Sequence, residues 1–197
     1  SGKYIKGPKI DTISRLNLFL SAHVIHQIQT EMTAVAEEIS ESLILAILVN
    51  GRRWIVTRVE NDRTISISRP ENTSKNFYEL PTGRILAAWA NDIELKEIIE
   101  ANSYPNEHWD DISNIHSLKK RLADVRKNGQ VTLREPCEGT CLISMSVPIL
   151  DENGSLTGAL GSYAPEFRCA PNKERQIKNT LWQLSTRLSS IINKDFN

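Results

Sequence analysis

Cysteine and histidine side chains are the groups in this sequence best suited to metal binding or covalent chemistry. The cysteines are Cys137, Cys141 and Cys169, and His108 and His116 precede them. Thiolates together with one of these imidazoles could hold a zinc ion. The spacing of Cys137 and Cys141 fits no standard zinc finger, however, and the residues between them indicate a loop. The sequence therefore favours three unpaired thiols over a metal site, and we expect no cofactor.

Covalent catalysis by one of these thiols is the second possibility. A nucleophilic cysteine needs a base beside it, and no histidine lies in a recognisable partner motif. Cys141, at the start of a predicted strand, would be the nucleophile of a thiol-dependent enzyme. The pattern favours a protein that is not an enzyme and has no catalytic residues. An odd, low number of cysteines also argues against a disulfide framework and favours a reducing, cytoplasmic environment.

The charge balance excludes two classes of partner for this chain. Its 197 residues carry 24 basic and 24 acidic side chains, so the formal net charge is zero. A domain that grips the nucleic-acid backbone by itself needs a basic excess, and so does a polybasic membrane-binding surface. The longest apolar run, from Leu43 to Val49, is far shorter than the roughly 20 residues of a membrane-spanning helix. A globular protein of one domain with a long appendage, or of two small domains, is expected.

Periodic apolar residues predict the elements of the first third of the chain. Apolar side chains recur at steps of three or four from Ile13 to Ile39, which predicts a helical segment of about seven turns. A meander of three strands should follow, because Asn50-Gly51 and Asn61-Asp62 are turn signals between alternating segments. The predicted strands are Leu43 to Val49, Arg53 to Glu60 and Thr64 to Ser68.

The rest of the chain predicts a group of helices and then three more strands. The expected helices cover Arg84 to Ala90, begin again at Asp92, run from a cap at Ser113 or Asn114 to Gly129, and begin a last time at Pro171. The expected strands are Gln130 to Arg134, Cys141 to Leu150 and Leu156 to Tyr163. Strands grouped apart from helices indicate an α+β fold with a six-stranded antiparallel sheet. Long terminal helices would cover one face, and a ligand cavity would lie on the other.

Small residues in the last strand bear on that cavity. Gly158, Ala159 and Gly161 leave space over one face of the sheet, where either a ligand or a helix could sit.

Several short motifs occur in a fixed order along nearly the whole chain. They are Tyr4 to Lys9, Val56 to Glu60, Thr82 to Ala88 ("TGRILAA"), Arg126 to Gly129, and Met145 to Gly154 ("MSVPILDENG"). In this order they resemble the effector-binding domain of the IclR family of bacterial transcriptional regulators. Thr82 to Ala88 resembles the family's "GKALLA" helix start, and Met145 to Gly154 resembles its "APVFDADG" hairpin. The resemblance implies a GAF-like or profilin-like fold.

The resemblance also implies that DNA binding and ligand binding belong to different domains of a longer regulator. A winged helix-turn-helix would read DNA, and this domain would bind a small metabolite. Residues 1–11 would be the remnant of the segment that leaves the DNA-binding domain, residues 12–40 a linker, and residues 41–197 the effector-binding domain. DNA contact is then expected only through an N-terminal domain absent from this sequence, which agrees with the zero net charge.

The family's effector site, carried over residue by residue, has two walls and an added arginine. A helix N-terminus offers free N–H groups and a positive dipole end, which suit a carboxylate, and a glycine lets the ligand approach the backbone. An arginine can pair a carboxylate with two hydrogen bonds. The expected effector is an organic, sugar or aromatic acid. The first wall is Pro81, Thr82 and Gly83; the second is Ser144, Ser146, Gly161 and Tyr163, with Arg134 as the arginine.

Two of these residues could have a purely structural role instead, and the function also has alternatives. Thr82 could serve only as the helix N-cap, and Arg134 could be a solvated surface arginine. The leading hypothesis is a ligand-sensing domain that forms a homodimer or tetramer, with no membrane partner. A small thiol-dependent enzyme and a purely structural oligomerisation module on the same scaffold are the alternatives.

Overall fold

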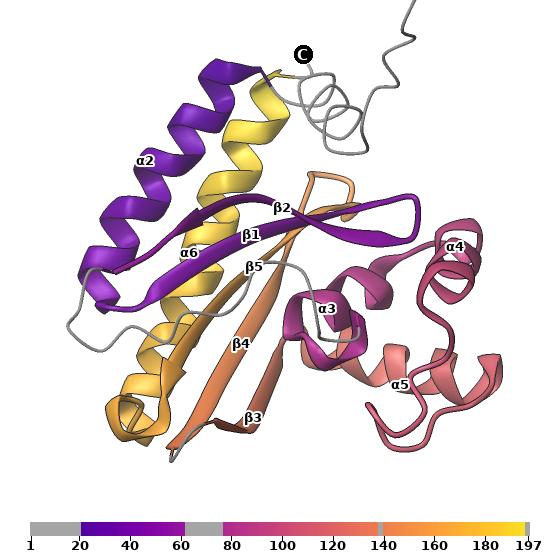
Figure 1. Cartoon of the computed structure of the whole chain (residues 1–197). Helices are drawn as coiled ribbons and strands as arrows, with labels where there is room; N and C mark the ends of the chain where they lie inside the picture. Colours follow the sequence, from indigo (N-terminus) through magenta and orange to yellow (C-terminus); the bar gives the residue numbers. More distant parts are fainter. Residues whose placement is uncertain (1–20, 62–76, 138–139, 196–197) are drawn as a thin grey trace, which may run out of the picture.

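The computed structural model describes residues 21–61, 77–137 and 140–195, and these form an α+β domain (Figure 1). This fold class is the predicted one. The first half contains α2 (Ala22–Ile39), β1 (Ser42–Val49), β2 (Arg52–Val59), the short 3-10 helix η1 (Phe77–Glu79), α3 (Pro81–Trp89), α4 (Asp92–Asn102) and α5 (Ile115–Asn128). The second half contains β3 (Val131–Cys137), β4 (Thr140–Leu150), β5 (Leu156–Pro165), the 3-10 helix η2 (Glu166–Arg168) and α6 (Pro171–Asp195).

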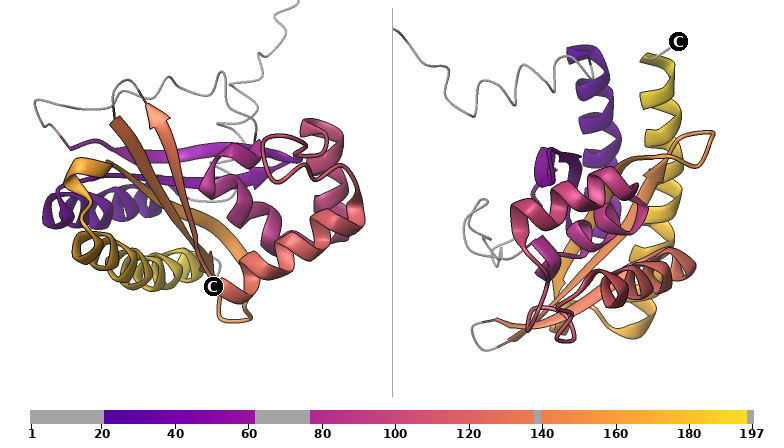
Figure 2. Two further views of the ribbon diagram at one scale, coloured as in Figure 1. Left: turned by 90° about the horizontal axis from the view of Figure 1, so that it is seen from below. Right: turned by 90° about the vertical axis from the view of Figure 1, so that its right-hand side faces the viewer.

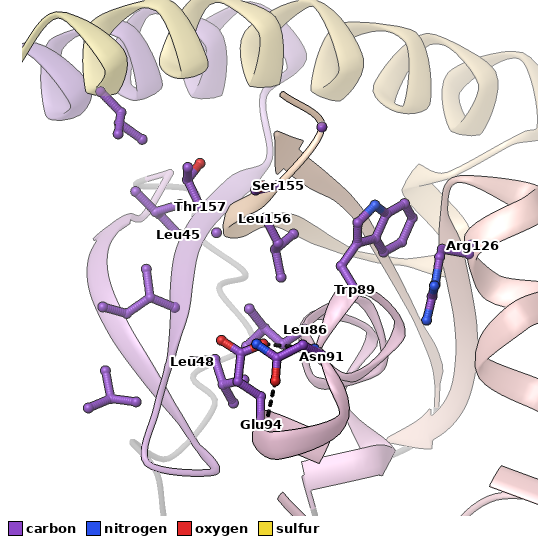
Figure 3. A pocket seen from close by; sticks show the side chains of 15 residues that line it. Leu45, Leu48, Leu86, Trp89, Asn91, Glu94, Arg126, Ser155, Leu156 and Thr157 are labelled. Carbon is purple, nitrogen blue, oxygen red and sulfur yellow. Dashed lines mark hydrogen bonds between the residues drawn. The ribbon is translucent and has the colours of Figure 1, made fainter. Parts of the chain in front are cut away.

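The described strands form one antiparallel sheet in the order β2-β1-β5-β4-β3. The ladder between β1 and β5 joins the N-terminal hairpin to the C-terminal strands and ends at the pair Ala46–Ala159. Five strands are described where six were predicted, and the predicted strand from Thr64 to Ser68 lies outside the described residues. Beyond Ala46 and Ala159, the two strands separate, and Figure 3 shows Leu156 of β5 and Trp89 of α3 at this end of the sheet.

Local sequence signals account for most element boundaries. Asn50 and Gly51 have φ values of 50° and 70°, as the predicted tight turn requires, and Gly129 caps α5 with φ 68°. The predicted helix start at Arg84 is wrong by three residues, because α3 begins at Pro81. Proline suits the first position of a helix because its missing N–H would have no acceptor there.

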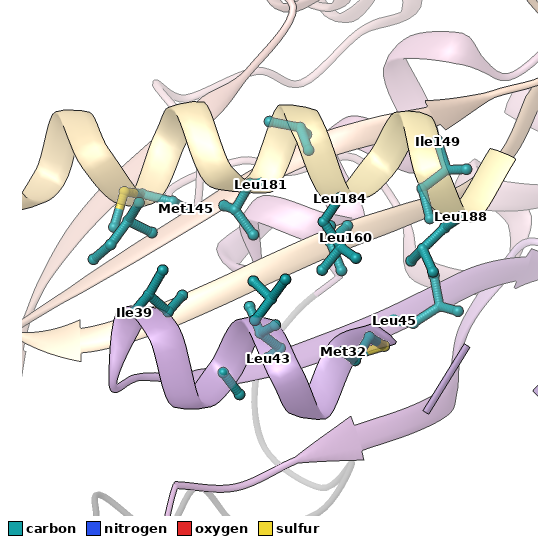
Figure 4. Packing of buried hydrophobic residues seen from close by; sticks show 14 of the residues in the cluster. Met32, Ile39, Leu43, Leu45, Met145, Ile149, Leu160, Leu181, Leu184 and Leu188 are labelled. Atoms are coloured by element: carbon teal, nitrogen blue, oxygen red, sulfur yellow. The ribbon is translucent and has the colours of Figure 1, made fainter. Parts of the chain in front are cut away.

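Two helices cover one face of the sheet, as the sequence predicted for the terminal helices. Figure 2 shows α2 and α6 lying side by side, and Figure 4 shows their apolar side chains meeting those of β1, β4 and β5. Leu181, Leu184 and Leu188 of α6 are fully buried in this cluster with Met32 of α2. This stripe, at steps of three or four, holds α6 on the sheet through burial of apolar surface.

A second apolar cluster covers the opposite face, beneath α3, α4 and α5. Ile85 and Leu86 of α3, Leu118 and Leu122 of α5, and Ala159 of β5 are buried there. Because α3 lies directly against β5, it is the helix that can present polar groups to the centre of the sheet. In the described part of the chain, no helix is both long enough and apolar enough to cross a membrane.

Candidate functional site

The N-terminus of α3 is the polar end of the helix that rests on the sheet. Its N-cap is Leu80, whose side chain makes no capping hydrogen bond, so Thr82 is a residue of the first turn and not the cap. The Thr82 hydroxyl instead accepts a hydrogen bond of 2.7 Å from Nε of Arg53, although Thr82 is only 2% exposed. Helix geometry leaves the N–H groups of Thr82 and Gly83 without an intrahelical acceptor. A guanidinium and a positive helix end therefore meet at one buried hydroxyl.

Gly83 is required by the close approach of η1. A Cβ atom built on Gly83 would lie 1.9 Å from the carbonyl oxygen of Phe77. Only a glycine at this position lets the backbone of η1 pass so close to the first turn of α3. The predicted role of Gly83 was close approach by a ligand; the structure fills that side of the residue with the backbone of η1.

Gly161 brings the helix and the sheet into contact. A Cβ on Gly161 would lie 3.0 Å from Cγ2 of Thr82 and 3.2 Å from Cγ2 of Ile44. The small residues of β5 thus receive a helix, which is one of the two occupants that the sequence allowed. Ser146, the cross-strand partner of Gly161, is fully buried and donates a hydrogen bond of 2.8 Å to the carbonyl of Leu160.

Ser144 and Tyr163 form the next cross-strand pair on the same face. They are opposite each other in the β4–β5 ladder, and Ser144 is also opposite Leu133 of β3. Leu133 packs on the apolar cluster beneath α3, and cross-strand partners share a face, so Ser144 and Tyr163 point toward the α3 side. Ser144 is 2% exposed and Tyr163 is half-buried. The structure therefore brings Thr82, Gly161 and the three polar residues of β4 and β5 to one face.

Arg134 does not join this group. Val131 and Leu133 of β3 face α3, so Arg134 points to the opposite face, where it forms an ion pair with Glu174 of α6. Lys178 and Arg134 hold the pKa of Glu174 below its usual value, with the hydrogen bond from Lys178 as the largest cause. Arg134 is half exposed there, as the surface alternative expected.

Arg53 and Arg58 of β2 are two cations on the α3 face, and the sequence did not single them out as site residues. Arg53 is opposite Leu48 and Arg58 is opposite Ile44, two residues of β1 that share that face. Simple alternation would put residues 53 and 58 on opposite faces. A register shift between Leu45 and Ala46, a β-bulge, inserts one residue of β2 and returns both arginines to one face. No composition or spacing signal marked this bulge.

Arg84 fixes the wall behind the first turn of α3. Its Nε donates to the carbonyl of Tyr78 at 2.6 Å, its Nη2 donates to the carbonyl of His108 at 3.3 Å, and its guanidinium lies 4.3 Å from the ring centre of Trp109. Burial lowers the pKa of Arg84 to about 10, which still leaves it charged at neutral pH. Because these contacts tie η1 and the loop after α4 to α3, the helix N-terminus is held in a preorganised position.

The candidate metal and thiol residues do not form a centre in the described part of the chain. No group of three or more histidine, cysteine or acidic side chains there could hold a metal ion. His108 is 2.8 Å from a carboxylate oxygen of Glu79, and His116 is exposed at the start of α5. Cys141 contacts the carbonyl of its neighbour Leu142, while the side chain of Cys137 lies outside the described residues.

Cys169 should react slowly with thiol reagents. It is 4% exposed, and burial, with the nearby carboxylates of Glu174 and Glu41, raises the pKa of its thiol. Since the thiolate is the reactive form, we expect a disulfide reagent at pH 8 to modify Cys141 at least about tenfold faster than Cys169. The rates are measured in a Cys137→Ser background with Cys141→Ser and Cys169→Ser as the paired variants. Equal rates would contradict the burial of Cys169.

Comparison with known proteins gives the family. Residues 17–190 match the family described as "Bacterial transcriptional regulator IclR C-terminal". An Escherichia coli K12 protein described as the uncharacterized HTH-type transcriptional regulator RhmR is 26% identical over 118 residues, which are 59% of this chain and 44% of that protein. The chain thus spans less than half the length of this curated relative.

Solved structures show the same fold. The C-terminal domain of the Escherichia coli regulator KdgR has a TM-score of 0.66 at 21% identity, covering 86% of this chain and 98% of that one. The inducer-binding domain of a double mutant of PobR from Acinetobacter, in complex with 3-hydroxybenzoic acid, has a TM-score of 0.67 at 20% identity, covering 85% and 98%. Because the family match spans most of the chain, including every described strand, this protein belongs to the IclR family of bacterial transcriptional regulators and comprises its C-terminal effector-binding domain.

Proposed function

We propose that this domain senses a small organic acid, such as an aromatic or sugar acid, at the N-terminus of α3. The observation that carries the proposal is the hydrogen bond of 2.7 Å from Arg53 Nε to the buried Thr82 hydroxyl. A ligand carboxylate beside Thr82 would accept from the guanidinium of Arg53 and from the N–H groups of Thr82 and Gly83. Arg53 thus takes the role that the sequence gave to Arg134.

The second wall of the proposed site keeps its predicted members. Ser144 and Tyr163 lie side by side on the α3 face and would contact the polar or aromatic body of the acid. Gly161 and Ser146 would support the site from beneath, because Thr82 rests on Gly161 and the Ser146 hydroxyl already bonds within the sheet. The PobR domain from Acinetobacter is described in complex with 3-hydroxybenzoic acid, which supports an aromatic acid as the first candidate.

The output we propose is control of DNA binding by a population shift. The acid would favour one position of α3 against the sheet, and with it one arrangement of a homodimer or tetramer. The affinity of a winged helix-turn-helix N-terminal to this domain for DNA would then change. Residues 1–11 and 12–40 would connect the two domains. This mechanism requires only that the ligand bind one arrangement of the dimer or tetramer more tightly than the other.

Thermal unfolding with a panel of acids tests the proposal directly. The panel contains 3-hydroxybenzoate, sugar acids and short keto acids, and a binding acid should raise the unfolding temperature in proportion to the logarithm of its concentration above the Kd. The neutral alcohol or amide of the best acid is the matched control. If no acid stabilises the domain, the sensing proposal fails.

Substitution of Arg53 should weaken the binding of that acid. Because one charge-assisted interaction is removed, we expect Arg53→Gln to raise the Kd about 10- to 100-fold, and Arg53→Lys to raise it less. Titration calorimetry measures both. Arg134→Gln is the control and should leave the Kd unchanged, since Arg134 lies on the other face. Equal losses in the Arg53 and Arg134 variants would contradict the proposed site.

A further inference from the structure

A cavity lies in the fork where β1 and β5 separate, at the C-terminal end of α3 (Figure 3). Its volume is about 680 Å³, within the range of sites that enclose small molecules. The last cross-strand pair of β1 and β5 is Ala46–Ala159, and beyond it the two strands border the cavity instead of each other. This cavity is distinct from the proposed acid site. Trp89 and Leu86 of α3 line it, whereas Thr82, about two helical turns from Trp89 and about one from Leu86, does not.

The walls of this fork cavity are mainly apolar and partly exposed. Leu48 of β1, Trp89 of α3 and Leu156 of β5 are each half-buried, although all three are large apolar side chains. Leu45 and Leu86 also line it and are fully buried. Partly exposed apolar side chains around a concave space favour an apolar ligand, because binding removes that surface from water.

The polar groups at the fork cavity leave one charge unpaired among the described residues. Asn91 and Glu94 already bind each other in the capping box of α4, where Glu94 accepts from the Asn91 N–H at 2.9 Å. The Thr157 hydroxyl donates to the carbonyl of Ile149 at 3.1 Å. Arg126, in the last turn of α5, lines the cavity and makes no ion pair within the described part of the chain.

We propose that the fork cavity is a second small-molecule site, which takes an amphipathic anion. The apolar part would lie between Leu48, Leu156 and Trp89, and the acidic group would pair with Arg126. A guanidinium suits a carboxylate, sulfonate or phosphate because it offers parallel donors. The site needs no contribution from Thr82 or Arg53. Failure of the proposed acid site would therefore not refute this second site, and the reverse also holds.

Two naphthylamine dyes test both parts of the proposal. 1-Anilinonaphthalene-8-sulfonate carries an anionic group, and N-phenyl-1-naphthylamine is its neutral analogue. Each dye should bind the intact 197-residue chain at about one molecule per chain and accept excitation energy from Trp89. Leu156→Glu should weaken the binding of both dyes at least about tenfold. Arg126→Gln should weaken the sulfonate about tenfold and leave the neutral dye unchanged. Lys127→Gln, the neighbouring exposed cation that does not line the cavity, is the matched control and should change neither.

Four results would overturn the proposal. They are unsaturable dye binding, equal losses in Arg126→Gln and Lys127→Gln, loss of dye binding in Arg53→Gln, and a dye site that disappears as the chain associates at higher protein concentration. The last result would assign the fork cavity to a second copy of the chain. Because Arg126 and Lys127 are exposed, their variants should fold, and thermal unfolding checks this.

Discussion

Gly83→Ala should lower the free energy of unfolding by about 3 kcal/mol or more. In an ordinary helix the same change stabilises by up to about 1 kcal/mol, because alanine has the higher helix propensity. At Gly83 the new Cβ would lie 1.9 Å from the carbonyl oxygen of Phe77 and 3.0 Å from its carbonyl carbon. Both are backbone atoms, so no side-chain rotation relieves the overlap. The first turn of α3 must move away from η1, and the proposed acid site moves with it.

Urea unfolding followed by circular dichroism measures this loss. The matched control is Gly154→Ala in the β4–β5 turn, where φ is +77° and no atom lies within 4 Å of the new Cβ. There only the left-handed backbone strain of about 1 kcal/mol is expected. Acid binding should also be lost in Gly83→Ala under conditions where the protein remains folded. A Gly83→Ala protein as stable as the parent would mean that η1 does not contact α3 as described.

The order and type of the elements could be predicted from the sequence because they depend on short-range patterns. The stripe of Ile177, Leu181, Leu184 and Leu188 in α6 repeats at steps of three and four, and it is buried as the pattern requires. Gly129 and Asn50-Gly51 mark a helix end and a turn because their backbones need positive φ. The motifs from Thr82 to Ala88 and from Met145 to Gly154 then fix the family through their order.

The candidate site was less predictable because its members meet through register and packing. The alternation of Val131 and Leu133 already places Arg134 on the opposite face from α3, so the position of Arg134 could be predicted from the sequence. The role of Arg53 could not, because it depends on the bulge opposite Leu45 and Ala46 and on an approach to Thr82 across the sheet. The position of α3 depends on Gly161, where the sequence allowed either a helix or a ligand.

Breaking the ion pair between Arg168 and Glu41 is the other change expected to have a large effect. Arg168 donates to the two carboxylate oxygens of Glu41 at 3.0 Å and 2.8 Å, and thereby joins η2 to the residue that precedes β1. The Glu41 side chain is 3% exposed and that of Arg168 is 21% exposed. Removal of the arginine leaves a buried carboxylate without this partner, which typically costs 3–5 kcal/mol. Because Arg168 is partly solvated, we expect Arg168→Met to cost about 3 kcal/mol, at the lower end of that range.

A double-mutant cycle separates the ion pair from the packing of the two side chains. If the cost arises from the uncompensated charge of Glu41, then Glu41→Gln in the Arg168→Met background should recover about half of it or more, because the buried group becomes neutral. Urea unfolding of the four proteins gives the coupling. Lys96→Met, which removes the exposed i,i+4 pair of Lys96 and Glu100 in α4, is the control and should change stability by no more than about 0.5 kcal/mol. Equal effects of Lys96→Met and Arg168→Met would show that burial of Glu41 does not govern the strength of this contact, and a double variant no more stable than Arg168→Met would assign the loss to packing.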